Sequence, residues 1–200
     1  MEKNEQIQLA WNYIKLNDIE RLKPLIEGNV NPNSYISDED CDINKLLAAA
    51  AAFGSLDSLS YLSDEGGNIE IVSKNGFSLL HWAASGGWDD IILFLISKGL
   101  SLDIEDKNGQ APLHLAAAHG HLSTIYLLIE HGANINCLTK FNWTPLHVSI
   151  AYGQQDVCNV LIQNGADYLI TDSFGRSAEV LALEYNRKWW NDLLKKNDNN

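Results

Sequence analysis

The stretch from Gln110 to Asn136 reads Q-A-P-L-H-L-A-A-A-H-G-H-L-S-T-I-Y-L-L-I-E-H-G-A-N-I-N and decides the fold. Pro112 opens its first apolar segment, and proline suits a first helical turn because the N–H that it lacks would have had no partner there. Gly120 divides the stretch in two, and glycine favours a break between helices. The stretch therefore predicts a pair of short helices.

These features recur at a fixed interval. Three histidines are spaced 33 residues apart: His81, His114 and His147. The same spacing separates the glycines Gly54, Gly87, Gly120 and Gly153, and the residues Ser78, Ala111, Thr144 and Ser177. A period of 33 residues is that of ankyrin repeats. The quoted stretch resembles the ankyrin family almost residue for residue, with Ala111 where that family usually has Thr.

The resemblance implies an all-α fold, an ankyrin-repeat solenoid of about six helix-turn-helix repeats with short β-hairpin tips. Each repeat would bury its apolar face against its neighbours. We expect one ankyrin-repeat domain over residues 1–197 and a disordered tail at 198–200. The expected repeats are residues 4–37, 40–72, 73–105, 106–138, 139–171 and 172–197, approximately.

Composition restricts the compartment and the partners. The 200 residues include 14 Lys and Arg against 26 Asp and Glu, a formal net charge of −12 that disfavours nucleic acid and anionic lipid as partners. The odd set Cys41, Cys137 and Cys158 favours a reducing compartment. The start M-E-K-N-E-Q-I-Q lacks the basic and apolar regions of a signal peptide, so we expect none. Leu46 to Phe53 is too short an apolar run to span a bilayer. We expect a cytoplasmic monomer that does not bind membranes.

One cluster of aspartates and one cluster of histidines could suggest a metal site, but neither has the complete set of ligands. Asp38, Asp40 and Asp42 have the spacing that begins a calcium loop, but Ile43 stands where its glycine is due. His119 and His121 lie near His114 without a fourth zinc ligand nearby. We therefore expect no metal and no cofactor, and we interpret Ser34 to Asp42 as a solvated loop.

The sequence also contains no enzyme signature. The phosphate-binding, dinucleotide-binding, zinc-protease and serine-hydrolase motifs are all missing from it. In the ankyrin family, the histidine of each repeat is a structural residue that hydrogen-bonds near the hairpin, which implies the same for His81, His114 and His147. We expect no catalytic residue and a protein that is not an enzyme.

The resemblance implies that contacts with partners are made by the hairpin tips and by the ends of the first helices, which line a concave face. At these positions the chain has a series of lysines and an excess of aromatic side chains, both of which are common in binding hot spots. The alternative for the lysines is that they are simply solvated at the turns. The alternative for Tyr152 and Tyr185 is that they pack between repeats. The candidate partner-binding residues are Lys74, Phe77, Lys107, His119, Lys140, Phe141, Trp143, Tyr152, Phe174, Arg176 and Tyr185.

Together these patterns predict a protein-protein interaction module that holds a protein partner with an acidic or amphipathic segment on its concave face. The alternatives are a nucleic-acid-binding protein that uses the lysines and a regulatory or inhibitory subunit of an enzyme. Ankyrin proteins of intracellular bacteria are similar in length, so a host-directed effector in the host cytosol is a further hypothesis. Asn136 corresponds to the asparagine that is hydroxylated in some members of the family.

Overall fold

The computed structural model of the chain describes residues 3–29 and 43–197. These residues form two compact units, which we describe separately. The first unit contains residues 1–74 and 78–100, and the second contains residues 75–77 and 101–200. The acidic segment Ser34 to Asp42 and the tail 198–200 lie outside the described residues, and the single domain over 1–197 stays a prediction.

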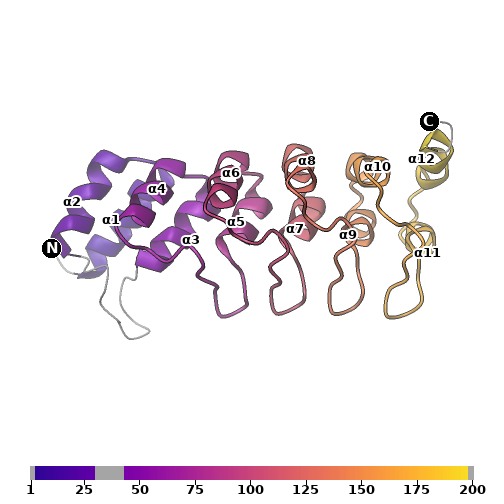
Figure 1. Cartoon of the computed structure of the whole chain (residues 1–200), viewed down its shortest axis with the longest axis horizontal. Coiled ribbons are helices and arrows are strands. Elements are labelled where there is room, and N and C mark those ends of the chain that lie inside the picture. The colour runs from indigo at the N-terminus through magenta and orange to yellow at the C-terminus, as the bar shows by residue number, and fades with distance from the viewer. Residues whose placement is uncertain (1–2, 30–42, 198–200) are drawn as a thin grey trace. The chain divides into compact units, whose positions relative to one another are not determined.

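The first unit contains three pairs of helices. The first helices of the pairs, α1, α3 and α5, pack side by side, and α2, α4 and α6 form a second row (Figure 1). The short turn between the helices of each pair keeps them antiparallel neighbours. The bounds are α1 Lys3–Lys15, α2 Ile19–Asn29, α3 Ile43–Phe53, α4 Leu56–Asp64, α5 Leu79–Gly86 and α6 Asp89–Ser97.

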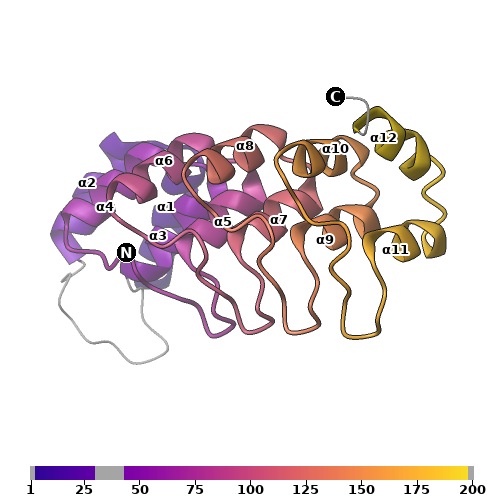
Figure 2. The same ribbon diagram turned by 45° about the vertical axis from the view of Figure 1, so that its right-hand side comes forward.

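The second unit repeats this arrangement. Here α7, α9 and α11 form one row and α8, α10 and α12 the other (Figure 2). Long loops project from the row of α7, α9 and α11, on the side away from the row of α8, α10 and α12. The bounds are α7 Pro112–His119, α8 Leu122–Glu130, α9 Pro145–Tyr152, α10 Gln155–Gln163, α11 Ala178–Glu184 and α12 Trp190–Asn197.

The described residues contain twelve helices and no strand, which confirms the all-α repeat fold. Small side chains let the first helices approach closely: Ala116 and Ala117 are fully buried in α7 together with Leu113. Truncation of such a buried leucine to alanine costs about 2–5 kcal/mol. The core of each unit therefore lies between its helix rows and between successive pairs, as a repeat architecture requires.

The helix ends follow from the residues that recur every 33 positions. The Thr144 hydroxyl accepts a hydrogen bond from the His147 backbone N–H at 3.2 Å, which caps α9. After α3, α5, α7 and α9 a glycine takes a left-handed conformation, as at Gly120 with φ 80° and Gly153 with φ 74°. After α1 and α11 an asparagine does so, Asn17 and Asn186. Most other side chains in that conformation would be strained.

A second recurring position binds the last carbonyls of the preceding first helix. Trp88 Nε1 donates to the Ala52 carbonyl at 3.1 Å, and Gln154 Nε2 donates to the Ala118 carbonyl at 3.0 Å. Arg187 holds the same position and donates to two carbonyls at the end of α9, at 2.8 and 2.7 Å. Three chemically different side chains thus satisfy helix carbonyls that have no partner within their own helix.

The loops between helix pairs end in tight turns, which we call tips, and in the second unit side-chain oxygens close them. Asp106 accepts from the backbone N–H groups of Asn108 at 2.7 Å and Gln110 at 2.8 Å. Thr139 accepts in the same way from Phe141 at 3.3 Å and Trp143 at 3.0 Å. The predicted hairpin tips are therefore turns, and the described residues contain one isolated β-bridge, Val72 to Ser78.

Successive tips of the second unit are hydrogen-bonded to one another. The N–H of Lys107 donates to Asn75, that of Lys140 to Asn108 and that of Ser173 to Phe141, each at 2.9 Å. The tips approach so closely that a Cβ on Gly109 would lie 2.8 Å from the Lys140 nitrogen. Gly175, in the last tip, has the same φ of 75° with no atom within 4 Å of such a Cβ.

The recurring histidines join each helix start to the next tip. In α7, His114 Nδ1 accepts from the Ala111 N–H at 3.0 Å, so Nε2 carries the proton and donates to the Trp143 carbonyl at 2.9 Å. His147 accepts from the Thr144 N–H at 3.2 Å and donates to the Arg176 carbonyl at 3.3 Å. The predicted structural role is thus confirmed for both. Burial lowers the pKa of His114 and of His147, despite the opposing effect of these hydrogen bonds.

The two tip glycines give a matched test of tip contact. We expect Gly175→Ala to lower the free energy of unfolding by about 1 kcal/mol, the cost of left-handed backbone with a Cβ. Gly109→Ala should cost at least about 2 kcal/mol, because its Cβ also forces apart the Lys140 and Asn108 backbones. Urea unfolding of the two variants measures the difference. Equal losses would contradict the tip contact.

The buried histidines predict that stability depends on pH. Folded His114 and His147 bind a proton less readily than they do in the unfolded chain, where the pKa is about 6.5. The free energy of unfolding should therefore be highest above about pH 6.5, where these histidines are neutral in both states. It should fall as the pH drops below that value. His147→Gln should flatten this decline, whereas His131→Gln, at an exposed side chain, should leave it unchanged. Urea titrations between pH 8 and 5 would refute the prediction if both variants kept the original slope.

Candidate functional site

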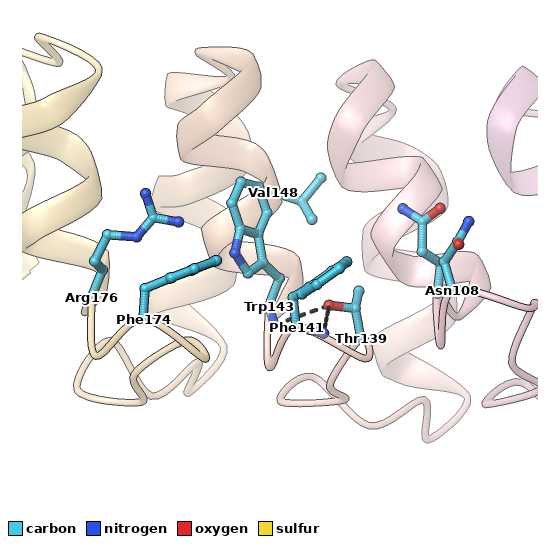
Figure 3. Close-up of a pocket in the computed structure, with 8 residues that line it drawn as sticks. Asn108, Thr139, Phe141, Trp143, Val148, Phe174 and Arg176 are labelled. Atoms are coloured by element: carbon cyan, nitrogen blue, oxygen red, sulfur yellow. Dashed lines mark hydrogen bonds between the residues drawn. The ribbon is translucent and has the colours of Figure 1, made fainter.

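The tips of the second unit enclose a pocket of about 400 Å³. Its walls are mainly the rings of Phe141, Trp143 and Phe174, with Val148 of α9 at its side (Figure 3). The three rings lie between Arg176 and Asn108, which stand at opposite ends of the group in the figure. The full lining is Asn108, Gln110, Thr139, Phe141, Trp143, Val148, Phe174 and Arg176.

The two phenylalanines are exposed to solvent although they belong to rigid tips. Phe141 is 61% exposed and Phe174 is 73% exposed. Their backbones are fixed, because the Phe141 N–H donates to Thr139 and the Phe174 N–H donates to Asp172 at 2.8 Å. Aromatic rings held in water by an ordered backbone contribute little to the core, so folding alone does not account for them.

Trp143 is half-buried, and the only polar atom of its side chain already forms a hydrogen bond. Its Nε1 donates to the Asp172 carboxylate at 3.2 Å, which ties the indole ring to the next tip. The ring also lies near His147, with the two ring centroids 6.5 Å apart. Trp143 is therefore a fixed wall that offers a pocket occupant its apolar ring and no unsatisfied N–H.

Arg176 is held at the other end of the pocket by two carboxylates. Its guanidinium contacts Asp172 at 2.7 Å and Glu184 at 2.9 Å. It also lies over the Phe174 ring, 5.1 Å from the ring centroid. Burial by itself would raise the pKa of Asp172, but hydrogen bonds from Arg176 and from the tip backbone outweigh it and lower the pKa to about 2. The Arg176 charge is thus neutralised within the chain.

The structure brings together four of the predicted partner-binding residues. Phe141, Trp143, Phe174 and Arg176 all line the pocket. Lys107 precedes the lining residue Asn108, and Lys140 lies between Thr139 and Phe141, so both lysines belong to the tips that form the pocket. Both lysine side chains are exposed.

The other predicted residues do not line this pocket. Lys74 is exposed in the first unit, and Phe77 is a half-buried residue of the second unit. Tyr152 is 66% exposed and Tyr185 is 42% exposed, so packing between repeats does not bury either ring. His119 is exposed, and its ring stacks on His121 with the centroids 6.0 Å apart. Desolvation, followed by the nearby His121, lowers the pKa of His119.

Four lining residues are not among the predicted partner-binding residues: Asn108, Gln110, Thr139 and Val148. Thr139 occupies the position of Asp106 and Asp172 in the 33-residue register, which marks it as the residue that closes the tip. Val148 occupies the register position at which the preceding repeats have Leu115 and Trp82. The smaller side chain leaves room beside Trp143, and comparison along this register was the signal that could have found it.

Three further features of the described chain concern metals, thiols and membranes. Residues 3–29 and 43–197 contain no group of three or more His, Cys, Asp or Glu side chains that could hold a metal ion. Burial raises the pKa of Cys137 and of Cys158 to about 12, so both thiols stay protonated at neutral pH. Among the helices described, none has the length and apolar character needed to cross a membrane.

Comparison with known proteins agrees with the repeat register. A family model described as ankyrin repeats (3 copies) matches residues 11–106, 46–139 and 90–172. A search of curated proteins found no match. The matched ranges overlap and together extend from residue 11 to residue 172, so that α11 and α12 lie beyond them. The chain therefore belongs to the ankyrin-repeat family.

Proposed function

We propose that this chain is a non-enzymatic adaptor that binds a protein partner on the tips of its second unit. Ankyrin repeats are in general protein-protein interaction modules. The observation that supports this site is the pocket of about 400 Å³ flanked by the exposed rings of Phe141 and Phe174. Exposed apolar clusters of this kind mark interaction surfaces on soluble proteins.

The chemistry of the pocket suits a protein partner. Aromatic side chains in preformed pockets are the residues that dominate binding energy at protein interfaces. Here Thr139 and Asp172 fix the backbone of the tips that carry Phe141 and Phe174, so little entropy is lost when these rings are covered. The tip surface is therefore organised before a partner arrives.

A second candidate partner is a nucleic acid, because Lys107 and Lys140 are exposed on neighbouring tips. Two lysines on a chain with a net charge of −12 give a weak attraction to phosphates. Arg176 adds little to it, because Asp172 and Glu184 already neutralise its charge. The protein partner is accordingly the function that we favour.

The proposed function is tested by removing the two exposed rings. We expect the double variant Phe141→Ala with Phe174→Ala to weaken binding of a purified partner about a hundredfold, since each hot-spot ring contributes about 1–2 kcal/mol. The partner would first be identified by quantitative affinity capture on the unchanged chain and on this variant. Isothermal titration calorimetry then measures the dissociation constants.

The matched control removes equally exposed apolar side chains elsewhere. Leu169 and Leu183 are 71% and 69% exposed and do not line the pocket. Leu169→Ala with Leu183→Ala should therefore leave the dissociation constant unchanged. Binding that survives loss of the rings, or that is lost in the leucine control, would place the partner on another surface.

A further inference from the structure

We infer that the partner segment inserts one bulky apolar side chain into the tip pocket and presents carboxylates to Lys107 and Lys140. This inference rests on the proposed function, since it describes the chemistry and the orientation of what binds there. Three features support it. The pocket walls are apolar, the Trp143 Nε1–H already donates a hydrogen bond to Asp172, and the unpaired lysines lie near one end of the pocket only.

The pocket walls select an apolar occupant. Phe141, Trp143 and Phe174 contribute ring surface, and the one indole N–H among them is donated to Asp172 at 3.2 Å. A polar side chain placed between these rings would lose its hydration without finding a partner on them, which costs free energy. A volume of about 400 Å³ accommodates one large side chain, aromatic or aliphatic, with part of its backbone.

The tips that form the pocket carry unpaired positive charge near one end of it only. At the Phe174 end, the Arg176 guanidinium is bound to Asp172 and Glu184 at 2.7 and 2.9 Å. Near the Asn108 end, Lys107 precedes Asn108 in the chain and the Lys140 N–H donates to the Asn108 carbonyl at 2.9 Å. Both lysine side chains are exposed beside the pocket without lining it, and within the part of the chain that the structure describes neither forms an ion pair. An approaching anionic group is therefore attracted to the lysine end.

The charge of the whole chain sharpens this preference. With a net charge of −12, the chain repels acidic segments in general, so the lysine end is a local exception. An acidic segment bound elsewhere would meet like charge, whereas at this rim it meets two cations beside an apolar pocket. The complementary segment has its carboxylates on one side of the apolar side chain, next to Lys107 and Lys140, and needs none on the Arg176 side.

The test is selection of short random peptides, displayed on phage, on the immobilised full chain. We expect the selected peptides to share one bulky apolar residue with Asp or Glu on one side of it. Selection on Lys107→Glu with Lys140→Glu should yield the same apolar residue flanked by Lys or Arg. For a synthetic acidic peptide from the first selection, this double variant should bind roughly tenfold more weakly. Lys188→Glu, at an exposed lysine outside the pocket, should bind it as the unchanged chain does.

The ring variant separates this inference from the proposed function. If Phe141→Ala with Phe174→Ala abolishes peptide binding but charge reversal of the lysines changes neither the selected flanks nor the affinity, the site stands and the orientation is wrong. If the selected peptides bind the ring variant as well as the unchanged chain, both proposals fail. The inference would also be overturned if the selection yielded no peptides and the chain instead bound a single-stranded oligonucleotide in a manner that requires Lys107 and Lys140.

Discussion

The backbone hydrogen bond from each tip to the next is the constraint on which the surface of the second unit depends. The N–H groups of Lys107, Lys140 and Ser173 each reach a carbonyl of the preceding tip at 2.9 Å. This spacing leaves no room for a side chain on Gly109. It also sets the distance between Phe141 and Phe174, which follow one another in the 33-residue register. The pocket is thus a consequence of how closely the tips are joined.

The repeat framework and the binding surface use different residues of the same unit. The buried histidines His114 and His147 and the glycines after four of the six first helices recur because the backbone needs them. Apart from the recurring lysines, the exposed side chains on the tips vary: the register that holds Asn108 in one tip holds Phe141 and Phe174 in the next two. A stable scaffold therefore tolerates almost any tip surface, and specificity resides in these variable positions.

The sequence was most informative where the period is strict. Pro112 and Gly120 predicted the limits of α7, which extends from Pro112 to His119. The register also placed Phe141, Trp143, Phe174 and Arg176 among the candidate partner-binding residues, and the structure brings these four together in one pocket. The resemblance to the ankyrin family, together with the missing catalytic partners, implied a structural role for the histidines.

Features that depend on side-chain packing could not be predicted from the register. The exposure of Tyr152 and Tyr185 depends on the size of their neighbours, which a repeat pattern does not specify. The neutralisation of Arg176 needs Glu184, eight residues away on α11, to turn toward the tip. Val148 of α9 lines the pocket beside Trp143 of the tip, a placement that the register does not specify. Packing of this kind is decided in three dimensions.

Amide hydrogen exchange of the tips, followed residue by residue by NMR, tests most directly whether the tips are joined as a fixed surface. The account predicts slow exchange for the N–H groups of Lys107, Lys140 and Ser173, each of which donates to a neighbouring tip. Exchange of these three amides at the rate of an unstructured chain would contradict it, because the rings of Phe141 and Phe174 would then have no fixed frame.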